Sequence, residues 1–291
     1  MTELIVSPCK KNAMSQPPYT QSNFRGICFP SREKHFFAWL DAGNNYQSHI
    51  PVAAAIFSLM RPGIVLDVGA NVGLLSKIFS CLFDEVYAFE PSAENRACIY
   101  KNLPENDCNV VVYPYALGDA EGQKLLYKCK ANCGGDTLLK PSDFDISDSV
   151  FSADSVMVNV RTLDSFDFQS PISCIKLDVQ GWESFVLRGA LKTLNRHKPV
   201  VICEIKSENI DNSKEIQSLL LSCGYRTATP LSPLDRLYIH EEDPLSNKKQ
   251  IRRQALRYMA RYAKSTLKTA YTTKQIREYC EVSVKSLKDC L

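Results

Sequence analysis

One stretch of the sequence, VLDVGANVG at residues 65–73, decides the fold. It begins as an apolar run, contains two glycines four residues apart, Gly69 and Gly73, and is followed by an apolar segment of helical length at 74–82. This order predicts a buried strand, a tight turn and a helix, and the glycines allow the backbone to come close to a ligand. Doubly wound sheets bind ligands at the carboxyl ends of their strands, so the turn also predicts a binding site.

Similar apolar runs recur along the chain. Nearly continuous apolar strands that alternate with helices indicate a parallel sheet covered on both faces. We therefore predict an α/β fold with a doubly wound, Rossmann-like sheet, preceded by a helix at 50–60 and closed by a strand at 237–240. The predicted parallel strands are 64–68, 85–89, 110–113, 172–177 and 200–205, and the helices between and after them are 74–82, 93–102, 181–195 and 213–223.

The segment between the third and fourth strands interrupts this alternation. Two antiparallel strands are expected in it, at residues 123–128 and 156–161, around a loop rich in Ser and Asp. Long insertions after a strand often form lids or substrate walls. We therefore expect an inserted antiparallel segment close to the binding site.

Composition is typical of a globular protein. Of the 291 residues, 45% are hydrophobic and 23% are charged, and no apolar run has the length of a membrane span or a signal peptide. These features favour a cytoplasmic protein. The 12 cysteines are scattered, so we interpret most as buried thiols; Cys129 and Cys133 lack the further ligands of a zinc site, and no metal site is predicted.

Basic residues gather at the end of the chain. The whole chain has a net charge of +3, whereas residues 248–291 contain 12 Lys or Arg and 3 Asp or Glu. Apolar and basic residues recur there at helical spacing on different faces, which predicts a basic amphipathic helix. The apolar face comprises Ile251, Ala255, Tyr258, Met259 and Tyr262, and the basic face comprises Arg253, Arg257, Arg261, Lys264 and Lys268.

The sequence leaves the partner of this helix open. Amphipathic helices usually pack on their own domain, or on a second copy in a homo-oligomer. An anionic membrane surface is the favoured external partner, with weak electrostatic attachment of a protein peripheral to the membrane. Nucleic acid is the other candidate for an external partner.

Residues at successive strand ends suit a nucleotide-like ligand. Glu90 ends the second strand, where its carboxylate can accept hydrogen bonds from both hydroxyls of a ribose. Asp67 precedes the first glycine, where a carboxylate disfavours a pyrophosphate and tolerates the cationic methionine portion of S-adenosylmethionine. The alternative is that the glycines only make a turn and that Glu90 caps the next helix. The candidate cofactor-binding residues are Asp67, Gly69, Asn71, Gly73, Glu90, Pro91, Ala116, Leu117 and Asp178.

Five motifs give the chain a family resemblance. They are VLDVGANVG at 65–73, FEPS at 89–92, YALGD at 115–119, RTLDSF at 161–166 and IKLDVQGWE at 175–183. In this order they resemble the FkbM-type methyltransferases over residues 50–240. The resemblance implies S-adenosyl-L-methionine as cofactor and O-methylation of sugars, macrolides or related secondary metabolites, so the expected partner is a hydroxyl-bearing small molecule or glycan. The family usually has Glu where this chain has Gln180, which weakens the case for a divalent metal there.

The chain divides into three parts on this interpretation. Residues 1–49 form an N-terminal extension, which is expected to be loosely ordered up to residue 30 because it is polar and lacks hydrophobic periodicity. Residues 50–246 form the S-adenosylmethionine-dependent methyltransferase domain. Residues 247–291 form the basic helical tail.

Methyl transfer from a sulfonium is an in-line displacement, so a hydroxyl acceptor must be aligned and its proton removed. Asp178, at the end of the fourth strand, is the leading candidate for the general base or acceptor-orienting group. Glu204, in the fifth strand, is the second, and Lys176 and Glu183 are further candidates on either side of Asp178. The alternative is structural: Lys176 pairs with Glu204, and Glu183 interacts with the dipole of its helix.

Two other functions stay open. The basic tail would suit an RNA or cap ribose methyltransferase, although the acidic body lacks a phosphate-binding stripe. Gln180 in place of the family acid would suit a catalytically silent S-adenosylmethionine-binding scaffold protein. A scaffold binds the cofactor without turnover, so titration with the cofactor and a methyl-transfer assay together distinguish a scaffold from an active methyltransferase.

Overall fold

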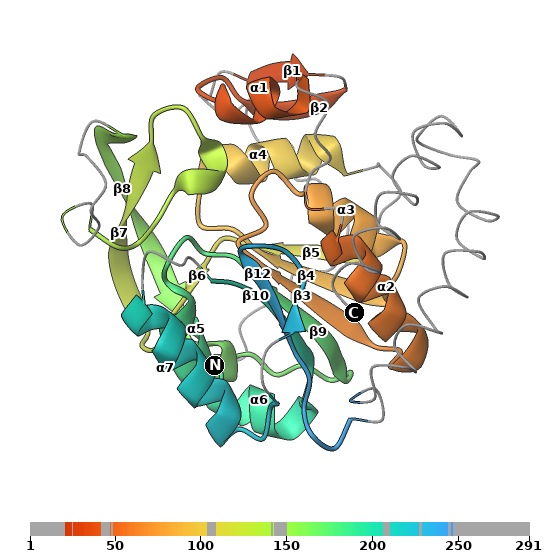
Figure 1. Cartoon of the computed structure of the whole chain (residues 1–291). Helices are drawn as coiled ribbons and strands as arrows, with labels where there is room; N and C mark the ends of the chain where they lie inside the picture. The colour runs from red at the N-terminus through yellow and green to blue at the C-terminus, as the bar shows by residue number, and fades with distance from the viewer. Residues whose placement is uncertain are drawn as a thin grey trace.

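The computed structural model describes residues 21–24, 26–41, 47, 49–103, 109–140, 142, 150–205, 210–226, 229–243 and 246. Its centre is a seven-stranded sheet with the order β11-β12-β10-β9-β3-β4-β5 (Figure 1). The predicted doubly wound α/β fold is confirmed, and β12 is the antiparallel member of the sheet. The strands are β3 (Ile64–Val68), β4 (Glu85–Phe89), β5 (Val110–Tyr113), β9 (Ile172–Leu177), β10 (Val200–Glu204), β11 (Thr229–Pro230) and β12 (Asp235–Tyr238).

The order of the strands reverses between β3 and β9. From β3 the chain proceeds outward to β4 and β5, and it then returns to lay β9 and β10 along the other side of β3. Val68 at the end of β3 is paired in parallel with Leu177 at the end of β9. The turn after β3 and the segment after β9 therefore meet at one edge, which is the switch point where such sheets bind ligands.

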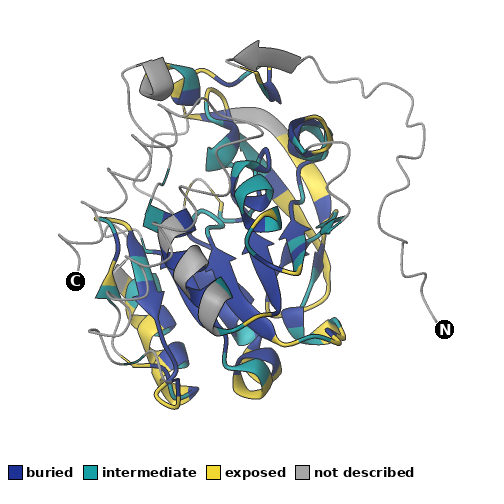
Figure 2. Cartoon of the chain, turned by 90° about the vertical axis from the view of Figure 1, so that its right-hand side faces the viewer, coloured by how far each residue is buried: buried dark blue, intermediate teal, exposed yellow. Residues whose placement is uncertain are grey.

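Side chains of β3 alternate between two apolar layers. Leu66 packs in a core cluster with residues of α5 (Glu183–Arg188), α6 (Leu191–His197) and α7 (Ile210–Ser222). Val65, on the opposite face, packs with residues of α2 (His49–Met60) and α3 (Leu74–Ser80). Figure 2 shows the resulting buried strands between helices whose outer sides are exposed. A strand covered on both faces needs the continuous apolar run that its sequence has.

The insertion forms a separate three-stranded sheet of order β6-β8-β7. Its strands are β6 (Ala116–Leu117), β7 (Gly122–Cys129) and β8 (Phe151–Arg161), and the antiparallel pair β7-β8 confirms the expectation, with both strands longer than predicted. Leu126 and Val160 pack in the same cluster as Leu66. The insertion is therefore part of the domain core.

Three predicted helices differ from the structure by more than one residue, and the one expected at 74–82 ends at Ser80 as α3. The expected helix at 181–195 is divided into α5 and α6 around Gly189, where an added Cβ would lie 1.9 Å from the carbonyl oxygen of Gly118. This close approach of two backbones ends the first helix, which periodicity alone does not reveal. The last helix, α7, begins at Ile210 instead of residue 213.

The N-terminal extension is more ordered than expected. β1 (Gln21–Phe24) and β2 (Ile27–Pro30) form an antiparallel hairpin, and α1 (His35–Asp41) follows. The expectation of loose order up to residue 30 was therefore wrong for these strands, because apolar residues of β2 and α1 are buried against the domain. Residues 1–20 and the predicted helical tail at 248–291 lie outside the described residues. Among the described helices, none is long and apolar enough to cross a membrane.

Candidate functional site

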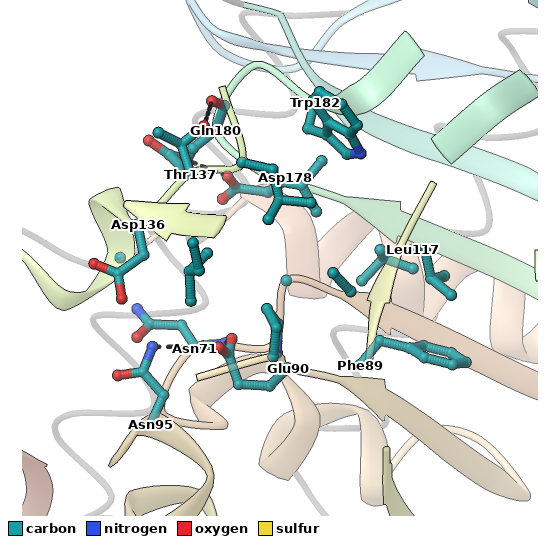
Figure 3. A pocket seen from close by; sticks show the side chains of 18 of the residues that line it. Asn71, Phe89, Glu90, Asn95, Leu117, Asp136, Thr137, Asp178, Gln180 and Trp182 are labelled. Atoms are coloured by element: carbon teal, nitrogen blue, oxygen red, sulfur yellow. Dashed lines mark hydrogen bonds between the residues drawn. The ribbon is translucent and has the colours of Figure 1, made fainter. Parts of the chain in front are cut away.

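A pocket lies at the carboxyl ends of β3, β4 and β9, where the inserted sheet meets the central one. Seven of the nine predicted cofactor-binding residues line it: Gly69, Asn71, Glu90, Pro91, Ala116, Leu117 and Asp178. The other two, Asp67 and Gly73, lie outside the lining. In Figure 3, Asn71, Glu90 and Asn95 occupy one side of the pocket, and Thr137, Asp178 and Gln180 occupy the opposite side.

The glycine turn is packed directly against the end of β9. Gly69 has φ +78°, and an added Cβ would lie 1.9 Å from the carbonyl oxygen of Asp178, so both the conformation and the space require glycine. Gly73 has φ +81° and precedes α3, where an added Cβ would crowd Ile99. Gly73 thus shapes the turn, while Gly69 lets the two strand ends meet at the pocket.

Glu90 is a buried carboxylate, 5% exposed, on one wall of the pocket. Its oxygens accept hydrogen bonds from the backbone N–H groups of Asn71 and Ser92, each at 2.8 Å. Burial raises the pKa of Glu90 to about 7; the charge of Asp136 adds to this rise, whereas the two N–H groups and Lys128 oppose it. Near neutral pH this carboxylate is therefore close to its titration midpoint.

Asp67 is fully buried beneath the pocket, away from its lining. It accepts a hydrogen bond from the Ser76 hydroxyl at 2.6 Å, and its other oxygen lies 3.3 Å from the ammonium nitrogen of Lys176. Lys176 also donates to the carbonyl oxygen of Gly69 at 2.7 Å. These contacts fasten β9 to the glycine turn.

The ion-pair partners of Lys176 differ from the predicted one. The sequence offered an ion pair between Lys176 and Glu204, but the ammonium group is placed between Asp67 at 3.3 Å and Asp178 at 4.0 Å. The reason is the strand order, because β9 has β3 as a neighbour and Lys176 is in register with Asp67. Burial alone would lower the pKa of Lys176, but the charges of Asp67 and Asp178 outweigh it and raise the pKa, so the side chain stays charged.

Asp178 is surrounded by donors. Its two oxygens accept hydrogen bonds from the side-chain amides of Gln180 at 2.7 Å and Gln47 at 3.3 Å, in addition to the ion pair with Lys176. Burial would raise the pKa of Asp178, but Lys176, these amides and a hydrogen bond shared with Glu204 outweigh it and lower the pKa. Asp178 is therefore held ionised at the pocket wall.

Gln180, the departure from the family pattern, has a defined role in this arrangement. Its amide nitrogen donates to Asp178 at 2.7 Å and to Glu204 at 3.0 Å, so one NH₂ group joins the ends of β9 and β10. Its backbone has φ +58°, and its carbonyl oxygen accepts a hydrogen bond from Thr137 of the insertion. Glu204, 9% exposed, lies behind this amide and outside the pocket lining.

Glu183 is buried at the first position of α5. One oxygen accepts hydrogen bonds from the backbone N–H groups of Val179 at 3.0 Å and Gly181 at 3.1 Å. Burial raises the pKa of Glu183, against the effect of these bonds. Glu183 lies outside the pocket lining. Its hydrogen bonds stabilise the turn that carries Asp178 and Gln180.

Several pocket residues escaped the sequence analysis. Within the described part of the chain, the buried indole nitrogen of Trp182 and the amide oxygen of Asn95 have no hydrogen-bond partner, and both residues line the pocket. Trp182 lies inside the motif at 175–183 and could have been singled out there, and Asn95 lies one helical turn after Pro91, within reach of an extended motif at 89–92. Asp136 has no local signal, because the fold of the insertion brings it to the pocket.

No metal site emerges from the described residues, among which no three His, Cys, Asp or Glu side chains are grouped to hold an ion. The arrangement instead combines three carboxylates, of which Glu90 is buried and Asp136 and Asp178 are partly buried, with apolar walls at Phe89, Ala116 and Leu117 and with unpartnered polar atoms. Such a pocket suits an organic ligand that has both a flat apolar part and several polar groups.

Comparisons with known proteins agree with the motifs. The family described as Methyltransferase FkbM domain matches residues 67–227. No protein of curated function matches the sequence. Among solved structures, a methyltransferase FkbM from Methylobacillus flagellatus KT is similar at 18% identity and a TM-score of 0.43, covering 62% of this chain and 44% of its own. This chain thus spans less than half the length of that protein.

Two further structures are similar over more of the chain. A ribosomal protein L11 methylase from Lactobacillus delbrueckii subsp. bulgaricus has 14% identity and a TM-score of 0.40, covering 77% of this chain and 100% of its own. A protein of the NADB-Rossmann superfamily from Streptococcus agalactiae has 11% identity and a TM-score of 0.41, covering 85% and 97%. The family match, not these distant similarities, identifies the chain.

Proposed function

Because this chain belongs to the Methyltransferase FkbM domain family, whose cofactor is S-adenosylmethionine, we propose that it methylates a hydroxyl oxygen of a sugar, glycan or secondary metabolite. The observation that carries the proposal is Asp178, a carboxylate held ionised in the pocket that also contains Glu90. A hydroxyl acceptor must lose a proton during methylation, and in this proposal Asp178 accepts it.

The pocket residues fit this cofactor. Glu90 offers a carboxylate for the ribose hydroxyls, and Phe89, Ala116 and Leu117 offer an apolar slot for the adenine. Gly69 and Asn71 present the glycine turn to the methionine portion. The unpartnered buried atoms of Trp182 and Asn95 support the fit, because a ligand with several donors and acceptors would satisfy them.

S-adenosylmethionine supplies an electrophilic methyl group on a sulfonium. Asp178 orients the acceptor by accepting a hydrogen bond from its hydroxyl, and its neighbours Lys176, Gln180 and Gln47 fix the carboxylate in place. Transfer would form the bond between the methyl carbon and the acceptor oxygen as the carbon–sulfur bond breaks and S-adenosylhomocysteine leaves, so the acceptor oxygen would become positive and its proton strongly acidic. A carboxylate whose pKa is lowered is therefore still basic enough to take that proton, and it remains ionised to do so.

The proposal is tested by incubating the protein with radiolabelled S-adenosylmethionine and panels of sugars, glycans, hydroxylated metabolites and RNA. Labelled ether on a small hydroxyl acceptor, lost in Asp178→Asn, supports it. Transfer to RNA alone would favour the ribose methyltransferase. Binding of S-adenosylhomocysteine without transfer to any class would favour the scaffold.

We also propose a cytoplasmic location, with residues 248–291 contacting an anionic membrane surface weakly. The support is the charge of this segment, 12 Lys or Arg against 3 Asp or Glu. Sedimentation with anionic and neutral liposomes at low and high salt is the test, and indifference to anionic lipid contradicts the contact. Salt-resistant self-association would instead favour packing of this segment in a homo-oligomer.

A further inference from the structure

The family match begins at residue 67, yet residues 27–41 contact one wall of the pocket. In Figure 1, β2 and α1 lie above α4 (Ala93–Asn102), beside the end of the insertion. The wall is the loop at residues 129–136, which follows β7 and contributes Cys133, Gly134 and Asp136 to the pocket lining. An N-terminal segment outside the matched region is thus attached to the candidate cofactor site.

Arg32 makes the most extensive contact. Its guanidinium pairs with Asp136 at 2.7 Å and with Glu94 of α4 at 2.8 Å, and it donates to the carbonyl oxygen of Cys129. Lys128 pairs with the same two acids, at 3.0 and 2.7 Å. Two cations and two anions therefore form a closed, largely buried network, which fixes the side chain of Asp136 at the pocket wall.

Glu33 holds the next part of the loop. Its carboxylate, 1% exposed, accepts hydrogen bonds at 2.6 Å from the backbone N–H groups of Phe36 and Cys133. The N–H groups of Lys34 and His35 both donate to the carbonyl oxygen of Ala131. The N–H groups at the start of α1 therefore donate to the pocket loop or to Glu33, and the loop in turn donates the N–H of Cys133 to Glu33.

The same segment is joined to the glycine turn. Asn102 of α4 exchanges hydrogen bonds with the backbone of Cys28 at 2.7 and 2.9 Å and donates to the carbonyl oxygen of Val72 at 2.8 Å. Phe29, Phe36 and Cys133 pack with Val72 in one buried apolar cluster. The segment thus contacts two parts of the pocket, the loop and the turn.

From this geometry we propose that Arg32 and Glu33 are positioning residues for S-adenosylmethionine, which hold the loop at 129–136 in its binding conformation. The proposal rests on the proposed function, in that it takes the pocket as the cofactor site. A loop that is already ordered loses less conformational entropy when the ligand binds, so docking of residues 27–41 and cofactor binding favour each other. By linkage, the cofactor must stabilise the docked segment by the same free energy.

The first test measures the affinity of the full chain for S-adenosylhomocysteine by isothermal titration. We expect Arg32→Gln to weaken binding about tenfold, within the roughly 5- to 150-fold range of typical couplings, and Arg32→Lys to weaken it less because the charge remains. The matched control is Arg61→Gln. Arg61 also pairs with a buried acid, Asp243 at 2.8 Å, and donates to the carbonyl oxygens of His197 and Lys198, outside the pocket lining.

Arg61→Gln is expected to lower the unfolding temperature without changing affinity. Unchanged affinity in a folded Arg32→Gln protein overturns the positioning role while the proposed function stands. Equal loss of affinity in both variants also overturns it, because a general loss of stability would then be the cause. Failure of the unmodified protein to bind the ligand overturns both proposals.

The second test needs no variant. Hydrogen exchange of the unmodified protein is compared with and without saturating S-adenosylhomocysteine. Slower exchange of the amides of Lys34, His35 and Phe36 on binding supports the coupling, since these N–H groups bond the loop or Glu33. Unchanged exchange at these amides, with protection at Asn71 beside Glu90, overturns it.

Discussion

Glu90, which is buried, and Asp178, whose side chain is 13% exposed, are carboxylates at strand ends of the same pocket, yet their pKa values move in opposite directions. The pKa of Glu90 is raised to about 7 and that of Asp178 is lowered. Burial favours a raised pKa for both carboxylates. The difference comes from their neighbours: Glu90 has neutral N–H donors and the acid Asp136 nearby, whereas Asp178 has the ammonium group of Lys176 and two amide donors.

This contrast assigns different tasks to the two ends of the pocket. A carboxylate that is ionised at all working pH values suits the chemical step, because its orientation and charge do not depend on the ligand. A carboxylate near its titration midpoint responds to the ligand, because donors on the ligand stabilise the ionised form. Four predictions test this contrast.

The largest effect is expected for Asp178→Asn. Loss of the proton acceptor should reduce turnover by about 10²- to 10⁴-fold, with a much smaller change in affinity for S-adenosylhomocysteine. The control is Asp164→Asn, which alters a carboxylate that accepts hydrogen bonds from the backbone of Lys192 and Thr193 outside the pocket lining. Full turnover of Asp178→Asn would contradict its role as the proton acceptor and would make Glu204 the leading candidate.

Glu90→Ala should affect binding instead of chemistry. Loss of charged hydrogen bonds to the ribose should weaken cofactor binding by about 1 to 3 kcal/mol, measured by isothermal titration. Glu85→Ala is the matched control, since Glu85 lies at the other end of the same strand and accepts a hydrogen bond from Tyr87. Equal affinities for wild type and Glu90→Ala would remove the ribose assignment.

The raised pKa of Glu90 predicts a pH dependence of cofactor affinity. Because the ribose hydroxyls stabilise the ionised carboxylate, binding is strongest above pH 7 and weakens as the pH falls through about 7, by up to tenfold per unit. Titrations below this pH, in buffers of different ionisation enthalpy, should show proton release on binding. Glu90→Gln should flatten the profile, and an unchanged slope in this variant would trace the titration to another group.

The smallest effect on turnover is expected for a variant that gives Asp178 an acidic neighbour, as Glu90 has in Asp136. Gln180→Glu replaces the amide that donates to Asp178 with a carboxylate, which should raise the pKa of Asp178 and shift the acid limb of the turnover profile upward by about one pH unit. Gln169→Glu is the control, because Gln169 donates in the same way to Asp167 at an exposed position. Identical acid limbs for wild type and Gln180→Glu would show that Lys176 and Gln47 are sufficient to keep Asp178 ionised.

The sequence alone determined the parallel sheet, the glycine turn and the positions of Glu90 and Asp178 at strand ends. These features depend on local properties: continuous apolar runs, glycine spacing and the residue that follows each strand. The two inserted strands were also predicted, although β8 begins at Phe151 instead of Val156. Local signals were sufficient wherever a residue's place is set by its own strand.

Only the tertiary structure decided which groups surround those carboxylates. The placement of Lys176 between Asp67 and Asp178 depends on β3 lying beside β9, more than 100 residues apart in sequence. The contacts of Gln180 with Glu204, and of Arg32 with Asp136, likewise join separate elements. Such neighbours set the pKa of a buried acid through distances of a few ångströms, and those distances exist only once strand order and loop packing have brought the groups together.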